Sequence, residues 1–370
     1  MAVSIPEAST QRQRNLVRFT QCIPRYCVTM GRMDEYSPQS RMLDRLGFIV
    51  PVWYPPGTSA SMRRSLLEVT LQDVETCVRP ENICLVNDGD ADSRNLLKEL
   101  SRTDEFQFID LETNKGKEYA VTLGMERLLE TRSALAFLAV RDADGDHFIQ
   151  DLPHLFRTAE AVQRITGPVM VIGRRNSLTQ PMGWLRGELE RLQNRVLLDA
   201  MRFNRARAGT VLDLRFCVSY GDFPDFQSGY KMYSREAAQR VFNLEASERM
   251  GPLSPEEFWH YGTESVSVVE GILQGVTLAE MNRATYRGQP VSGFATFQAA
   301  EFYSSVIAWI LWRLQIPSTE CVLLLDNHIP RLDLWFQPEG RRLLQKIRDI
   351  VAGRLGLNVP LSPPKGTPFL

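Results

Sequence analysis

Three aspartates, Asp142, Asp144 and Asp146, alternate along the chain directly after the apolar run 133–140. Alternate side chains of an extended segment point to the same side, so this spacing predicts three neighbouring carboxylates at the end of a buried strand. Carboxylates held this close repel one another and raise one another's pKa, unless a hard cation gathers their oxygens. We therefore predict a divalent metal site, for Mg²⁺ or Mn²⁺, at these three residues.

Two other interpretations of the acidic run remain open. A calcium loop of the EF-hand type also has Asp at alternate positions, but it requires Gly at its sixth position and Glu at its twelfth, where this chain has His147 and Pro153. An acidic surface turn would explain the charges and Gly145 without any ligand. The apolar run that leads directly into the aspartates favours a buried strand, and therefore the metal site.

A second segment suited to chemistry is the turn before residue 118, where Gly116 lies between Lys115 and Lys117. A helix is predicted from there to about residue 130. The N–H groups and the positive dipole end at its start suit an anionic ligand. Lysines before a helix are also commonly solvated without a ligand, so that alternative stays open.

The elements that would position these residues alternate between strand and helix. Strands are predicted over 48–54, 82–86, 106–111, 133–140, 168–173 and 276–280, and helices over 59–77, 93–100, 152–165, 184–201, 297–314 and 341–355, the last two separated by 321–328. This alternation predicts a parallel sheet with right-handed crossovers. Such sheets bind ligands beyond the carboxyl ends of their strands, so Tyr54, Asp88 and Asp142 should lie at one edge.

Composition and charge exclude several classes of protein. The 370 residues carry a formal net charge of −1 without a basic stripe, so we expect no nucleic-acid partner. The six cysteines form no C-x-x-C pair, which indicates reduced thiols in a cytoplasmic protein and no zinc site. We expect no signal peptide and no transmembrane segment, because the most apolar run, 302–312, is about half of the ~20 residues that a span needs. Its apolar face predicts internal packing, with a homodimer or a peripheral membrane surface as the alternative.

Four segments in order, 85–93, 114–124, 141–147 and 225–238, resemble the GT-A glycosyltransferases. The resemblance is greatest to the polyprenyl-phosphate sugar transferases of the dolichyl-phosphate mannose and glucose synthase type. It implies an α/β fold of the GT-A kind over residues 46–296, a Rossmann-like three-layer sandwich with a mostly parallel central sheet. Residues 1–45 would then be an N-terminal extension, and residues 297–370 a C-terminal helical appendage.

The resemblance implies metal-dependent transfer of a sugar from a nucleoside-diphosphate sugar to an acceptor that it does not identify. The positions that match the family's motifs are Tyr54, Pro55 and Asp88 beside the nucleotide base, Lys117 in the Gly-containing loop, Gly229 beside the sugar and acceptor, Asp142 and Asp144 on the metal, Asp146 in place of a Gln that also reaches the metal, and Glu264 facing the acceptor. A carboxylate at Glu264 suits removal of the acceptor proton. The alternative for Glu264 is a charge that complements a helix dipole.

Departures from this family keep other functions open. Its members commonly have Gly-Ser-Arg where this chain has Gly173-Arg174-Arg175, and the last 70 residues match no part of the family. Retaining enzymes that make glucosyl- or mannosylglycerate also look similar around 262–264, but they use a metal-binding His that is absent from 284–289. A sugar-phosphate nucleotidyltransferase would have a Gly-rich first loop in place of 53–57. A nucleotide-sugar-binding protein without catalysis is the remaining alternative.

Overall fold

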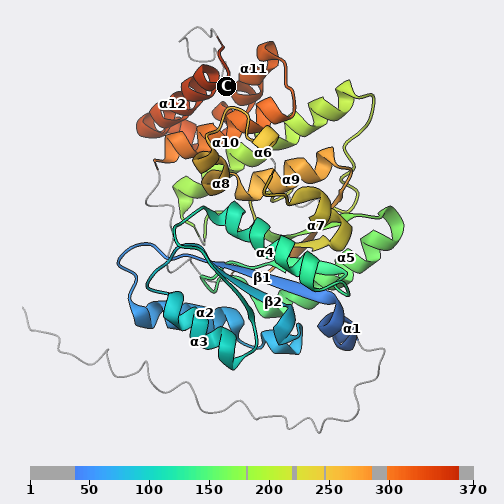
Figure 1. The fold of residues 1–370 in the computed structure, drawn as a ribbon. Helices are drawn as coiled ribbons and strands as arrows, with labels where there is room; N and C mark the ends of the chain where they lie inside the picture. Colours follow the sequence, from blue (N-terminus) through green and yellow to red (C-terminus); the bar gives the residue numbers. More distant parts are fainter. Residues whose placement is uncertain (1–37, 181, 219–222, 246, 286–297, 358–370) are drawn as a thin grey trace, which may run out of the picture.

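The computed structural model describes residues 38–180, 182–218, 223–245, 247–285 and 298–357 (Figure 1). Most of the predicted N-terminal extension, residues 1–37, lies outside the described residues. Its last residues form helix α1 (Pro38–Arg45), which packs against α5 (Leu152–Thr166) on one face of the sheet.

A single seven-stranded sheet forms the centre of the molecule. Its strands lie in the order β3-β2-β1-β4-β6-β5-β7. They are β1 (Leu46–Val52), β2 (Ile83–Asn87), β3 (Gln107–Asp110), β4 (Phe137–Val140), β5 (Val169–Arg175), β6 (Lys231–Ser234) and β7 (Thr277–Arg283). Only β6 runs antiparallel to its neighbours β4 and β5, while the other paired strands are parallel. The predicted α/β fold with a mostly parallel sheet is confirmed.

Helices cover both faces of this sheet (Figure 1). The remaining helices are α2 (Ala60–Leu71), α3 (Arg94–Thr103), α4 (Lys117–Thr131), α6 (Trp184–Arg207), α7 (Arg235–Val241), α8 (Pro255–Tyr261), α9 (Thr263–Leu273), α10 (Ala299–Arg313), α11 (Ser318–His328) and α12 (Pro338–Arg354). Strand residues alternate between two buried clusters: Ile49 belongs to one, and Phe48 and Val50 belong to the other. The first cluster is completed by α4, α6, α7 and α9, and the second by α1, α2, α3 and α5.

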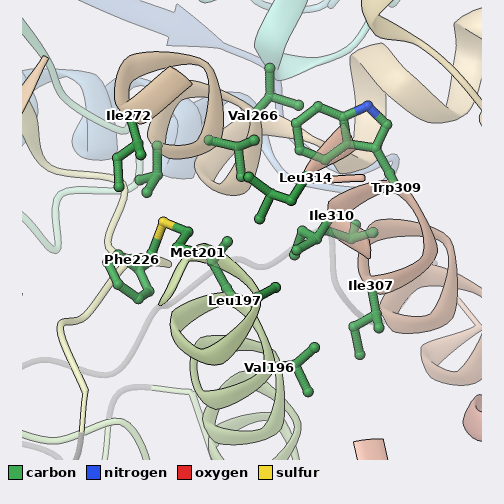
Figure 2. Packing of buried hydrophobic residues seen from close by; sticks show 14 of the residues in the cluster. Val196, Leu197, Met201, Phe226, Val266, Ile272, Ile307, Trp309, Ile310 and Leu314 are labelled. Carbon is green, nitrogen blue, oxygen red and sulfur yellow. The ribbon is translucent and has the colours of Figure 1, made fainter. Parts of the chain in front are cut away.

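The C-terminal helices extend the first cluster. Ile307, Trp309 and Ile310 of α10 are fully buried against apolar residues of α6 and α9, as Figure 2 shows. The indole Nε1 of Trp309 donates a 2.6 Å hydrogen bond to the carbonyl of Arg249, which satisfies the polar end of this side chain. The predicted internal packing of this apolar face of α10 is therefore what the structure shows, in place of a dimer or membrane surface. None of the described helices combines the length and the apolar character that crossing a membrane requires.

Three details differ from the sequence predictions. Segment 321–328, expected to separate two helices, is itself helical in α11, because Cys321, Leu324, Leu325 and His328 are buried at helical spacing. Helix α2 ends at Leu71 and is followed by a short 3₁₀ turn at Val74–Thr76, because Asp73 adopts a left-handed backbone (φ 59°). Helix α6 continues six residues beyond the predicted Met201, to Arg207.

Candidate functional site

The carboxyl edge of the sheet contains a change in strand order beside β1. From β1 the chain adds β2 and then β3 on one side, and it returns to place β4 on the other side. Ligands of open α/β sheets bind at such switch points. Tyr54, Asp88 and Asp142 follow the ends of β1, β2 and β4. Because β6 is antiparallel, Gly229 at its beginning lies at the same edge.

Lys117 joins two of the predicted site residues at this edge. Its ammonium lies 2.7 Å from Oδ1 of Asp142 and 2.8 Å from Oε1 of Glu264. Lys117 is the first residue of α4, and Glu264 lies in the first turn of α9. Gly229 provides the space for this contact, since a Cβ there would lie 2.7 Å from Oδ2 of Asp142 and 3.1 Å from the Lys117 ammonium. The structure therefore brings together Lys117, Asp142, Gly229 and Glu264.

Two further charged residues lie beneath this contact. A small cavity is lined by Lys117, Gly229 and Glu264 together with the buried side chains of Glu118 and Lys231. The Lys231 ammonium donates a 2.7 Å hydrogen bond to the carbonyl of Ser228. Oε2 of Glu118 is buried and has no hydrogen-bond partner among the described residues. Sequence reasoning missed both, because no spacing along the chain indicates that α4, β6 and α9 meet.

The electrostatics of this group hold Glu264 ionised. Burial would raise the pKa of Glu264, but the ammonium groups of Lys117 and Lys231 outweigh it and lower this pKa to about 2. Burial likewise would lower the pKa of Lys117, but Asp142 and Glu264 raise it. The pKa of Glu118 shifts in the opposite direction to that of Glu264, because burial and the charge of Glu264 raise it to about 8. Burial lowers the pKa of Lys231 to about 8.

The acidic run is a turn rather than an extended segment. Gly145 has a left-handed backbone (φ 75°), and the Asp142 N–H donates to Nδ1 of His147 at 3.3 Å. As a result Asp142 faces Lys117, while Asp146 lies beside His147 (3.2 Å) and Arg283 (3.9 Å). The run does form a turn, as the surface-turn interpretation expects, but Asp146 within it is buried rather than exposed. The strand that precedes the turn also fits no EF-hand, which requires a helix there.

His147 gives the turn its shape. Its ring stacks on Tyr230 with centroids 4.7 Å apart and an angle of 5° between the planes. Burial lowers the pKa of His147 to about 3, so the ring is neutral at physiological pH. With Nδ1 accepting from the Asp142 N–H, the ring proton is on Nε2, which faces Asp146. The stacked ring is a fixed part of the site.

The chemistry of the acidic run fits a divalent cation, although its geometry is not assembled for one. Within the described residues, no group of three His, Cys, Asp or Glu side chains is arranged to hold a metal ion. Burial, Asp146 and Asp142 together raise the pKa of Asp144 well above its usual range, which is the crowding that a cation would relieve. Oδ1 of Asp146 is buried, and its 3.2 Å contact with Nε2 of His147 does not have the geometry of a hydrogen bond. These oxygens are the ligands that Mg²⁺ and Mn²⁺ prefer.

Asp88 and Tyr54 direct their polar atoms toward the protein. The carboxylate of Asp88 accepts from the N–H groups of Lys115 (2.7 Å) and Gly116 (3.1 Å). These N–H groups, which the sequence suggested for an anionic ligand, are therefore already paired. The hydroxyl of Tyr54 donates to the carbonyl of Ala143 at 2.8 Å. Both residues fix neighbouring loops, and the sequence alone did not indicate these partners.

A buried ion pair holds the loop that follows β1. The guanidinium of Arg63 contacts the carboxylate of Asp90, and its Nη2 lies 3.1 Å from Asp92. Oδ2 of Asp90 also accepts from the Ser93 hydroxyl (2.7 Å) and from the backbone N–H of Tyr54 (3.4 Å). Arg63 belongs to α2, so this contact links that helix to the loops after β1 and β2. Sequence reasoning missed this contact, and its only signal was the unusual number of acidic residues between 88 and 92.

Comparisons with known proteins find similarity only among solved structures. No protein-family model matches the chain, and no curated protein matches its sequence. A mannosyltransferase from Pyrobaculum calidifontis, solved with GDP-mannose and Mn²⁺, aligns with 86% of this chain and 89% of its own at 11% identity and a TM-score of 0.44. A 4-diphosphocytidyl-2C-methyl-D-erythritol synthase from Anaerococcus prevotii aligns with 73% of this chain and 98% of its own at 11% identity and a TM-score of 0.34. Similarity this low does not identify an activity.

Proposed function

We propose that the protein is a metal-dependent glycosyltransferase, which moves a sugar from a nucleoside-diphosphate sugar to an acceptor. The observation that supports this most is the contact of Lys117 with Asp142 and Glu264 at the switch point of the sheet. Breaking a sugar–phosphate bond leaves a diphosphate whose negative charge must be stabilised. Removing the acceptor proton requires a base. Lys117 offers the positive charge and Glu264 offers the carboxylate.

Lys117 couples these two tasks. A diphosphate at the switch point competes with Glu264 for the ammonium of Lys117. When Lys117 turns to the diphosphate, Glu264 loses the cation that contributes most to its low pKa. Its pKa then rises, which makes the carboxylate a stronger proton acceptor. Donor binding thus prepares Glu264 to act as the base.

The acidic run would hold the metal. Asp142, Asp144 and Asp146 are the carboxylates for it, after the side chains reorient from their present contacts. A bound Mg²⁺ or Mn²⁺ supplies Lewis-acid stabilisation of the leaving diphosphate. Asp146 would leave its present contacts with the neutral His147 ring and the buried Arg283 to reach the metal.

The nucleotide end of the donor would lie along the loops after β1 and β2. Tyr54, Pro55 and Asp88 border it there. Because the Tyr54 hydroxyl and the Asp88 carboxylate already bond to the protein, these residues act mainly by fixing the shape of the site. Gly229 leaves room for the contact of Asp142 with Lys117, and the sugar would take this room when Lys117 turns to the diphosphate.

A panel of donors tests this proposal. We expect one of UDP-, GDP- or ADP-sugars to raise the melting temperature only when Mn²⁺ or Mg²⁺ is present, because a ligand of the native state must stabilise it. Asp144→Ala should lose this metal dependence and sugar transfer while it keeps the wild-type fold by circular dichroism. Retained turnover in Asp144→Ala would refute the metal assignment.

The same preparation separates the remaining alternatives. Incubation with nucleoside triphosphates and sugar phosphates, followed by detection of pyrophosphate, tests for a nucleotidyltransferase. Stabilisation by a nucleotide sugar without its hydrolysis or transfer, across a panel of acceptors, would instead identify a binding protein. Release of nucleoside diphosphate from the stabilising donor supports the glycosyltransferase.

A further inference from the structure

Helix α8 lies between α4 and the C-terminal helices (Figure 1). Residues 114–117, here called the Lys117 turn, lead into α4 and pack against the backbone of α8. A Cβ at Gly116 would lie 2.3 Å from the carbonyl oxygen of Trp259 and 2.7 Å from the backbone nitrogen of His260. Only a residue without a side chain allows so close an approach. The end of α8 therefore forms one wall of the Lys117 turn.

His260 adds a hydrogen bond to this packing. Its Nε2 lies 3.0 Å from Oδ1 of Asn114, and the same oxygen accepts the N–H of Gly116 at 2.9 Å. The bond from Gly116 identifies this atom as the oxygen of the amide, so Nε2 of His260 is the donor. His260 thus fixes the Asn114 side chain, which in turn holds the N–H of the residue before Lys117.

Aromatic rings continue the contact from α4 through α8 to α10. Tyr119 of α4 meets Trp259 edge to face, with ring centroids 5.3 Å apart. The ring of Phe258 lies 5.0 Å from that of Trp259 and 6.1 Å from that of Trp309 in α10. Such inclined aromatic pairs favour one relative orientation of the rings. The position of α8 therefore depends on α10 as well as on α4.

Glu257 joins α8 to both α10 and α12. Its carboxylate contacts the guanidinium of Arg354 in α12, with Nη1 of Arg354 3.3 Å from Oε2. The hydroxyl of Ser305 in α10 lies 3.2 Å from Oε1. Oε2 also accepts the N–H of Ser254 (3.0 Å) in the capping box that begins α8. The C-terminal helices therefore hold the first turn of α8, while its last turn contacts the Lys117 turn.

We infer that Arg354 and His260 are positioning residues of the candidate site, and that the C-terminal helices hold the Lys117 turn through them. Arg354 acts on Glu257 at the start of α8, and His260 acts on Asn114 from the end of the same helix. Packed helices and hydrogen-bond networks carry this kind of coupling between distant residues. The C-terminal helices, which match no part of the family that the chain resembles, thus have a part in shaping the site.

The consequence for the reaction rests on the proposed function. Lys117 has to turn from Glu264 to the diphosphate, which requires that its backbone keeps its place at the switch point while the side chain moves. A displacement of about 1 Å at a reacting group can lower the rate about a hundredfold. Release of the Lys117 turn should therefore lower the rate of sugar transfer without removing any group that the donor contacts.

Hydrogen exchange of the full chain without ligand, followed by mass spectrometry in segment 113–120, tests the inference. We expect exchange there to be about two- to thirtyfold faster in Arg354→Met and in His260→Leu than in wild type, the range typical of changes along a coupled network. Arg354→Lys keeps a cation and His260→Gln keeps an amide donor, so each should restore much of the wild-type rate. The double variant Arg354→Met/His260→Leu should show less than the product of the two factors, because both changes act through α8.

The matched control is Arg348→Met, which breaks the pair of another α12 arginine with Asp326 of α11 (2.7 Å) and leaves the Glu257 contact in place. It should lower the free energy of unfolding but leave exchange in 113–120 unchanged. His154→Leu, at an exposed histidine of α5 on the other face of the sheet, controls for the loss of an imidazole.

Wild-type exchange in either Arg354→Met or His260→Leu, equal acceleration in Arg348→Met, or a factor in the double variant equal to the product would overturn the inference. Faster exchange in the two variants of a protein that binds no nucleotide sugar would keep the inference and refute the proposed function. Sugar transfer at the same rate by wild type and Arg354→Met, with wild-type exchange in both, would do the reverse.

Discussion

Two cations of this protein each lie between two carboxylates, and they differ in how they are held. Arg175 contacts Asp225 and Glu190 through several N–H groups, and its side chain is 5% exposed. Lys117 contacts Asp142 and Glu264 through one ammonium, and its side chain is 29% exposed. Arg175 joins β5, α6 and the segment before β6, whereas Lys117 lies at the open edge of the sheet.

The difference separates a structural contact from an exchangeable one. A guanidinium fixed by parallel hydrogen bonds in a buried site can leave only at a large cost, because a buried carboxylate, here Asp225, would stay behind without a counter-ion. An ammonium is a point charge on a flexible stem, and it can turn to a new anion when one arrives. The first arrangement holds the sheet and α6 together. The second can exchange Glu264 for a diphosphate.

Replacing Arg175, the buried cation, should have the largest effect on the free energy of unfolding. Arg175→Met strands the carboxylate of Asp225 in the interior and leaves Glu190 with Arg186 (3.0 Å), so we expect a loss of about 3–5 kcal/mol in the free energy of unfolding. Urea denaturation at neutral pH measures it. The matched control is Arg64→Met, which breaks an exposed pair with Glu99 and should cost less than about 1 kcal/mol. Equal losses in the two variants would show that the Arg175 contact is not structural.

Replacing Lys117, the cation at the open edge of the sheet, should affect activity more than stability. In Lys117→Met we expect sugar transfer to fall about a hundredfold or more, because an electrostatic partner of the leaving diphosphate is lost. The free energy of unfolding should fall by only about 1 kcal/mol, since the pair is partly exposed. Lys117→Arg keeps the charge and should retain part of the transfer rate.

Metal binding gives this variant a second readout. Without the ammonium, Asp142 loses its cation and should bind Mn²⁺ more tightly, which calorimetry of the donor-free protein measures. Weaker Mn²⁺ binding in Lys117→Met would contradict the assignment of Asp142 to the metal. A loss of stability as large as that of Arg175→Met would contradict the comparison itself.

The strands that carry the site could be predicted from the sequence, because they depend on local patterns. Apolar runs with turns behind them indicated the strands, and parallel pairing then placed Tyr54, Asp88 and Asp142 at one edge. The bounds of the predicted strands and helices mostly agree with the structure to within a few residues. The exceptions are α11, whose helical spacing of apolar residues is present in the sequence and was missed, and the ends of α2 and α6; α2 ends at a backbone angle of Asp73 that no local pattern indicates.

The contacts within the site could not be predicted. Lys117 and Glu264 are 147 residues apart, and only the packing of α9 beside α4 and β6 brings them together. The alternation of the three aspartates suggested one shared direction, but the turn at Gly145 and the bond from Asp142 to His147 direct Asp142 to Lys117 and Asp146 to His147, while Asp144 stays close to Asp146. The sequence also did not indicate that Asp88 accepts from the N–H groups of the 115–116 turn, because those N–H groups could bind any anion.

Glu118, buried beneath the contact of Lys117 with Asp142 and Glu264, predicts that the free energy of unfolding depends on pH. Its pKa is about 8 in the folded protein, against about 4.3 in an unfolded chain, because burial and Glu264 disfavour its charge. A raised pKa stabilises the fold fully below about pH 4.3, and this contribution is lost as the pH rises to about 8. Glu118→Gln stays neutral, so its stability relative to wild type should rise by roughly 3.5 kcal/mol between pH 5 and pH 8.

Urea denaturation of both proteins at pH 5, 6, 7 and 8 measures this slope. Lys231 does not produce the same trend: its pKa is lowered to about 8, so its contribution to stability grows with pH between about 8 and 10.5, above the measured window. Glu99→Gln, at an exposed carboxylate, should leave the pH profile parallel to that of wild type. A parallel profile in Glu118→Gln as well would mean that Glu118 is ionised in the folded protein. The cations Lys117 and Lys231 would then compensate the charge of Glu118, as Arg175 compensates that of Asp225.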